Sequence, residues 1–105
     1  MLVVNRFRLD GAPEEAFRVG LLAAHQALAA CTGYVAGEIG RNLDEPDLWV
    51  LTTRWESIGA YRRALSSYDV KLTAVPVLSR ALDEPSAYEV VEPNSVINVH
   101  GARVT

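Results

Sequence analysis

Alternating side chains at the start of the chain predict a β-strand from Leu2 to Leu9. Each face of this strand holds every second residue: Val3, Asn5, Phe7 and Leu9 on one side, and Leu2, Val4, Arg6 and Arg8 on the other. Because both sides carry apolar residues, we expect both faces to be at least partly covered in the folded protein.

Two stretches have the spacing of helices. The first is expected to run from Pro13 to about Ala30, since proline suits the first helical position, and its apolar stripe consists of Phe17, Leu21, Ala24 and Leu28. The second is expected to begin after Ser57, a favourable N-cap residue, and its apolar positions are Ile58, Tyr61, Leu65, Tyr68 and Leu72. Pro76 should break or kink this second stretch, which predicts a helix in two parts.

Three further segments are predicted to be strands: Tyr34 to Arg41, Leu48 to Trp55 and Ser86 to Glu92. The first of them has little packing surface because it is rich in glycine and alanine, whereas the second is dense in aromatic and β-branched residues. The turn-forming residues from Asn42 to Asp47 join these two strands into a hairpin.

The order strand, helix, strand, strand, helix, strand is typical of a ferredoxin-like α+β domain, βαββαβ, in which the helices cover one face of a four-stranded antiparallel sheet. The helices can cover only that face, although the strands Leu2 to Leu9 and Leu48 to Trp55 carry apolar residues on both. The simplest cover for the second face is the same face of another copy, so the sequence predicts a homodimer.

Composition limits the classes of protein to which the chain can belong. Its 105 residues fit one domain, and shares of 50% hydrophobic and 22% charged residues are typical of a folded globular protein. A net charge of -3 gives no basic patch, so we expect neither a nucleic-acid nor a membrane partner. The single Cys31 and the absence of a secretory signal pattern predict a cytoplasmic location. No apolar run approaches the roughly 18 residues that span a bilayer.

The motifs of the common enzyme classes are missing. The sequence contains no GxGxxG, no phosphate-binding P-loop and no GxSxG. His25, Cys31 and His100 do not have the spacing of metal ligands, so we expect no metal site. Cys31 follows His25 by six residues, on a different side of the expected helix, which favours a buried thiol over a Cys-His nucleophile.

Asn5 is the most informative polar residue, because alternation places its amide on the core-facing side of the first strand. An unpaired buried amide costs about 1–3 kcal/mol. Either a local backbone group satisfies Asn5, or a ligand or water in a cavity does, and the sequence does not separate these two readings. His25 lies at the border of the first helix's apolar stripe, where we expect a histidine that faces solvent.

Four segments together resemble a known family: NRF at Asn5 to Phe7, TGY at Thr32 to Tyr34, LWVLTTRWES at Leu48 to Ser57, and AYRRAL at Ala60 to Leu65. This chain resembles the antibiotic biosynthesis monooxygenase (ABM) family over residues 1–92, which leaves 93–105 as a C-terminal arm or tail. The resemblance implies a dimeric α+β barrel. It also implies either cofactor-independent oxidation of polyketide anthrones to quinones or oxygenative degradation of haem.

The haem-degrading branch relies on an Asn in the first strand and on a Trp and a ligating His in the second helical region. Asn5 matches the first, but the Trp position falls on Ala64 and the His position falls on Ala74 or Val75. From Glu56 to Pro85 there is no His, Cys or Met, so the sequence argues against haem and leaves Tyr61 and Tyr68 as the only conceivable axial donors. We also expect no other cofactor.

The resulting prediction is a cofactor-independent monooxygenase that oxidises a hydroxylated aromatic or polyketide-type small molecule. Asn5 is the expected catalytic residue, as a donor to the developing enolate oxygen, and the expected substrate-binding residues are Phe7, Trp55, Tyr61 and Tyr68. No residue is an obvious general base, since Tyr68 and Asp69 stand where family members often carry His. The alternative is a non-catalytic dimeric module that binds an apolar metabolite or a pathway partner.

Overall fold

The computed structural model describes residues 1–96; residues 97–105, which belong to the expected C-terminal arm, lie outside the described part. The elements in chain order are β1 (Leu2–Arg8), α1 (Glu14–Ala29), β2 (Tyr34–Arg41), β3 (Leu48–Trp55), α2 (Ile58–Leu65), α3 (Tyr68–Thr73), α4 (Val75–Leu78) and β4 (Ala87–Tyr88). Among the described residues, no helix combines the length and apolar character that crossing a membrane requires.

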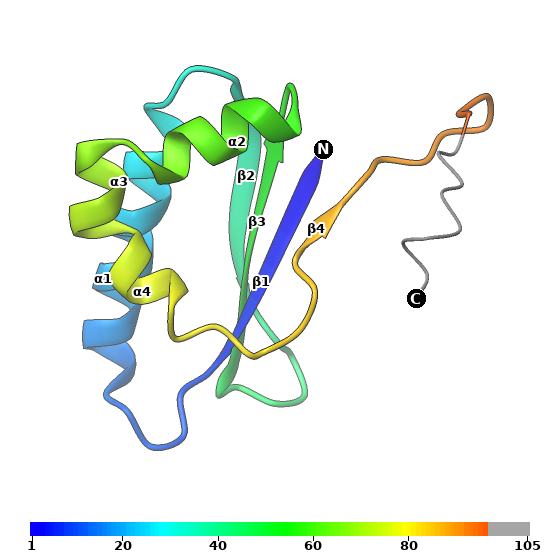
Figure 1. Ribbon diagram of the computed structural model, residues 1–105. Coiled ribbons are helices and arrows are strands. Elements are labelled where there is room, and N and C mark those ends of the chain that lie inside the picture. The colour runs from blue at the N-terminus through cyan, green and yellow to red at the C-terminus, as the bar shows by residue number, and fades with distance from the viewer. Residues whose placement is uncertain (97–105) are drawn as a thin grey trace.

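The four strands form one antiparallel sheet in the order β2-β3-β1-β4. All four helices lie on the same side of this sheet (Figure 1). This arrangement confirms the α+β, ferredoxin-like fold that the sequence predicts.

The register of the sheet decides which residues form the core. In β1 and β3, Val3 lies opposite Thr53 and Phe7 lies opposite Trp49, and all four side chains are buried. Helix α1 covers this row with its own buried stripe, which consists of Phe17, Leu21, Ala24 and Leu28, the residues expected from the helical spacing. The core-facing row of β1 therefore also includes Asn5.

The second helical region differs from the expected helix in two parts, because it is divided into α2, α3 and α4. The first interruption comes at Ser66 and Ser67, whose hydroxyls donate to the carbonyls of Arg62 (3.3 Å) and Ala64 (2.8 Å). Such local hydrogen bonds compete with the helical ladder. The second interruption precedes Pro76, which lies in the first turn of α4, as proline's missing N–H favours.

The last strand is shorter than expected. We predicted a strand from Ser86 to Glu92, but only Ala87–Tyr88 pairs with β1. Tyr88 lies opposite Leu2, so β1 has almost no residues left to pair with the chain beyond that point. The following segment leaves the body of the domain, and Val91 is 62% exposed (Figure 1).

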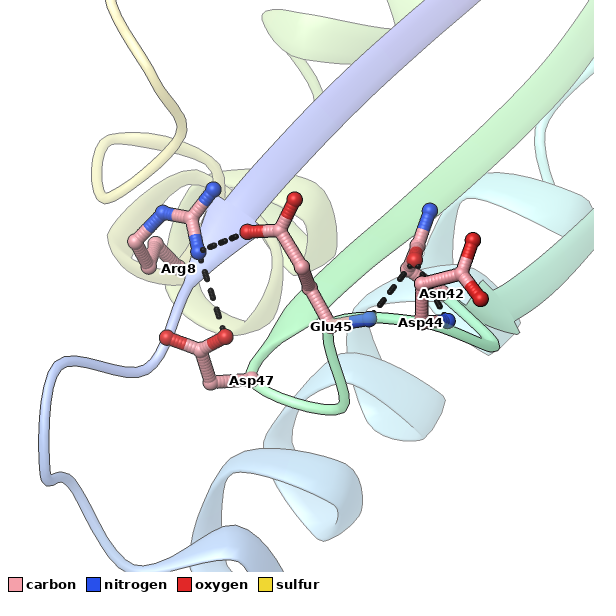
Figure 2. Close-up of polar contacts among 5 residues, drawn as sticks. All are labelled: Arg8, Asn42, Asp44, Glu45 and Asp47. Carbon is pink, nitrogen blue, oxygen red and sulfur yellow. Dashed lines mark hydrogen bonds and ion pairs between the residues drawn. The ribbon is translucent and has the colours of Figure 1, made fainter.

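Ion pairs hold the loops at the other face and edge of the sheet. Arg6 donates two hydrogen bonds of 2.7 Å to the Glu84 carboxylate, which fastens the loop before β4 to β1 and lowers the pKa of Glu84. At the β2–β3 connection, Arg8 bonds Glu45 and Asp47 at 3.1 Å each (Figure 2). In the same connection, the Asn42 side chain accepts hydrogen bonds from the backbone N–H groups of Asp44 and Glu45, as Figure 2 also shows.

Candidate functional site

Asn5 is half-buried on the helix-covered face, opposite the fully buried Leu51. Its amide lies near enough to the Tyr61 hydroxyl to influence the pKa of that phenol. Burial raises the pKa of Tyr61, and the nearby Asn5 amide offsets part of that rise. The phenol is therefore protonated at neutral pH, and the amide and the hydroxyl are two neighbouring hydrogen-bond donors.

Helix α2 positions Tyr61. The helix begins after Ser57, whose hydroxyl accepts a hydrogen bond from the Ala60 N–H at 3.1 Å, as expected for an N-cap. Ala60 and Ala64 bury one side of α2 against the sheet, and the half-buried Tyr61 follows directly after Ala60. This short helix thus holds the phenol ring against Trp55 at the end of β3.

Trp55 closes the core at the end of β3 and is 1% exposed. Its indole N–H donates to the Thr53 hydroxyl at 2.9 Å, so the polar atom of the ring is satisfied. The rings of Tyr34 and Tyr61 pack on it, each with centroids 5.4 Å from the indole. Trp55 therefore presents a flat apolar surface, and two neighbouring aromatic rings pack against it.

The expectation that His25 faces solvent was wrong. Instead of facing solvent, its imidazole is half-buried, and its Nε2 lies 2.6 Å from the Tyr34 hydroxyl. One sequence feature is consistent with this contact. Gly37 lies on β2, which packs against α1, and a glycine there leaves space for the two side chains. A Cβ at Gly37 would lie 2.6 Å from the Tyr34 hydroxyl and 2.8 Å from the His25 Nε2.

Five residues from five elements thus follow one another across the helix-covered face: Asn5, Tyr61, Trp55, Tyr34 and His25. We call this set the aromatic row. Three of the residues expected from the sequence belong to it, while Phe7 and Tyr68 do not. Phe7 packs against Phe17 in the core at 5.4 Å, and Tyr68 is 74% exposed at the start of α3.

A surface pocket of about 560 Å³ lies between the end of α1 and the region of α2 and α3, with Cys31, Arg63 and Ser67 among its lining residues. This pocket includes no member of the aromatic row. The Cys31 thiol donates to the Ala27 carbonyl at 3.4 Å, as a structural cysteine does. Pocket and thiol are therefore separate from the candidate site.

Metal ligands do not converge in the part of the chain that the structure describes, where no three His, Cys, Asp or Glu side chains could hold one ion. Ala64 and Ala74, two of the positions that the resemblance assigns to haem contacts, are buried core residues. Their methyl groups supply neither a ligand nor a stacking surface.

The fold and the aromatic row define a small ferredoxin-like α+β protein with an amide and a phenol on its helix-covered face. The model of the antibiotic biosynthesis monooxygenase family matches residues 1–74, and the chain belongs to that family. A comparison with curated proteins gives no match.

Solved structures show the same fold. SnoaB, a cofactor-independent oxygenase from Streptomyces nogalater, is 24% identical, with 90% of this chain and 96% of that chain covered and a TM-score of 0.71. Rv0793 from Mycobacterium tuberculosis is 22% identical, with 90% and 97% covered and a TM-score of 0.67. At these identities the likeness extends to the fold alone.

Proposed function

We propose that this protein is a cytosolic, cofactor-independent oxygenase that oxidises a hydroxylated aromatic or polyketide-type molecule. The observation that carries the proposal is the placement of two neutral donors on the helix-covered face, the Asn5 amide and the Tyr61 hydroxyl, near enough for the amide to offset part of the rise in the Tyr61 pKa. Two such donors suit an oxygen atom that becomes negatively charged during the reaction. Membership of the family and the likeness to SnoaB support the same class of chemistry.

The proposed reaction begins with loss of a proton from the methylene carbon of an anthrone to solvent, which leaves an enolate. The Asn5 amide and the Tyr61 hydroxyl stabilise the enolate oxygen, and Trp55 supports the ring system. The electron-rich carbon then reacts with O₂ to form a hydroperoxide. Loss of water leaves the quinone carbonyl, so one oxygen atom enters the product and the other leaves as water. Tyr61 acts here as a donor because burial raises its pKa.

Replacing Asn5 with alanine tests this role. With an anthrone panel under oxygen and without added flavin or metal, we expect kcat to fall about 100-fold, as for loss of one oxyanion donor. The melting temperature should stay close to that of the native protein, because Asn5 is only half-buried. Asn42→Ala, in the exposed β2–β3 connection, is the matched control and should retain full turnover.

Two outcomes would contradict the proposal. A lower melting temperature with an unchanged rate would make Asn5 a structural amide. No turnover of any anthrone by the native protein would favour the alternative, a non-catalytic dimeric module that binds an apolar metabolite.

We further propose that the active form is a homodimer built through the sheet face opposite the helices. Support comes from the half-buried apolar side chains on that face, Leu2, Val4 and Val50, which no helix covers. Sedimentation velocity should give twice the chain mass of 11.5 kDa. Val4→Asp, or Thr52→Lys on the neighbouring strand, should shift the mass to that of one chain, whereas Val19→Asp on the exposed side of α1 should not. A native protein that stays monomeric at all concentrations would refute this interface.

A further inference from the structure

The hydrogen bond between His25 and Tyr34 is a short, partly buried contact between two elements of the fold. It links α1 to β2 over 2.6 Å, and both side chains are half-buried. Glycine at position 37 leaves room for the pair, since a Cβ there would lie 2.6 Å from the hydroxyl and 2.8 Å from the imidazole nitrogen, as well as 2.6 Å from the Thr52 carbonyl oxygen. Three residues from α1 and β2 are therefore matched to one another at this point.

The Tyr34 hydroxyl has a proton to donate to this bond. Burial raises the pKa of Tyr34, so its phenol is protonated at neutral pH. The hydroxyl can then donate to the His25 Nε2, which restrains the rotation of the Tyr34 ring. The proposed reaction does not use this pair, because Trp55 lies between it and Tyr61.

The orientation of Tyr34 bears directly on the candidate site. Its ring meets the Trp55 indole edge-on, at an interplanar angle of 87° and a centroid distance of 5.4 Å, and the other neighbour of the indole is Tyr61. Edge-to-face contacts of this kind depend on ring angle. A Tyr34 ring without its hydrogen bond would leave the indole one fixed aromatic neighbour instead of two, in addition to the Thr53 hydroxyl.

We propose that His25 and Tyr34 are positioning residues: their hydrogen bond holds Trp55 in the orientation that keeps Tyr61 against Asn5, and so sets the affinity of the site for an aromatic ring. The effect on ligand affinity rests on the proposed function. The effect on the orientation of Trp55 is independent of it.

Near-ultraviolet circular dichroism tests the effect on Trp55 without any ligand. The sequence has two tryptophans, so in a Trp49→Phe background Trp55 alone gives the indole bands. That background is favourable because the Trp49 indole nitrogen is buried without a hydrogen-bond partner among residues 1–96, and phenylalanine removes this donor. Tyr34→Phe and His25→Leu should each remove most of the intensity of the Trp55 bands. His25→Gln, which keeps an acceptor at similar reach, should restore them, and Tyr88→Phe at the exposed β4 is the matched control.

The second measurement uses dithranol, a hydroxylated anthrone, as the probe. Loss of the hydrogen bond should raise KM about fivefold, equivalent to about 1 kcal/mol, while kcat stays within about twofold, because the pair does not touch the reacting atoms. His25→Gln should keep the native KM. A kcat loss with unchanged KM would contradict a positioning role.

The possible failures are distinguishable. If Tyr34→Phe and His25→Leu lower the melting temperature but leave the Trp55 bands unchanged, the pair is only a brace between α1 and β2 and the inference is refuted. If the bands change but the native protein neither binds nor oxidises dithranol, the proposed function fails for this class of ligand, and the effect on Trp55 stands alone. If the bands change and KM does not, the link to ligand affinity is refuted.

Discussion

Replacing Gly33 with alanine is expected to lower the free energy of unfolding by about 2–5 kcal/mol, a large fraction of the stability of an ordinary domain. Two costs add at this position. Gly33 has a φ of +90°, which a residue with a Cβ adopts only under strain. The new Cβ would also lie 2.4 Å from the Cβ of Ala60, where α2 packs against the start of β2, and overpacking of this kind costs about 1–3 kcal/mol or more.

Gly11 provides the matched control, because its φ of +86° is similar but a Cβ there meets no atom of the described residues within 4 Å. Gly11→Ala should therefore show the backbone cost alone, about 1–2 kcal/mol. Adding Ala60→Gly to Gly33→Ala should recover most of the steric part, which urea unfolding of the single and double variants measures as a coupling energy. Equal losses for Gly11→Ala and Gly33→Ala would show that the contact with Ala60 does not matter.

The position of Gly33 connects stability to the candidate site. The Gly33 carbonyl accepts a hydrogen bond of 2.8 Å from the Glu56 N–H, just before the Ser57 N-cap of α2. Tyr34 follows Gly33 directly and Tyr61 follows Ala60, so one close contact places two members of the aromatic row. This accounts in physical terms for the sequence Thr32-Gly33-Tyr34.

Local patterns were sufficient to predict most of the fold. The strands Tyr34–Arg41 and Leu48–Trp55 have the bounds that the sequence suggested, and α1 lies within one residue of its expected ends. Alternation and helical spacing involve residues close together in the chain, so they predict an element without knowledge of the segment that packs against it. The length of β4 could not be predicted in this way, because it depends on where β1 begins rather than on the segment Ser86 to Glu92 itself.

The residues of the candidate site likewise fall into those that local sequence predicts and those that depend on contacts with other elements. Asn5, Trp55 and Tyr61 were predicted because an amide and two aromatic residues at core-facing or strand-end positions are notable in the sequence alone. His25 was misjudged because its environment is decided by Tyr34, which another element brings within hydrogen-bond distance. Tyr68 has the helical spacing of an apolar position, but the break at Ser66 and Ser67 starts a new helix on which it faces solvent.

Trp55→Ala is expected to have an effect of similar size to Gly33→Ala, a loss of about 3–5 kcal/mol in the free energy of unfolding. The indole is 1% exposed, and its removal leaves the facing edges of Tyr34 and Tyr61 without their common neighbour. Denaturant unfolding followed by far-ultraviolet circular dichroism gives this loss, since the signal does not depend on the deleted fluorophore.

The two tryptophans also allow a comparison in which the substitution is the same and only the hydrogen bond differs. Trp55→Phe deletes an indole N–H that donates to the buried Thr53 hydroxyl at 2.9 Å, whereas Trp49→Phe deletes a buried N–H that finds no partner in the described part of the chain. The first exchange should therefore cost about 1–2 kcal/mol more than the second, because it breaks a satisfied pair while the other relieves an unsatisfied donor. If Trp49→Phe proves as costly as Trp55→Phe, the loss of ring volume alone accounts for the change in the free energy of unfolding at both positions. The hydrogen bond to Thr53 would then contribute nothing to the stability of Trp55 in the aromatic row.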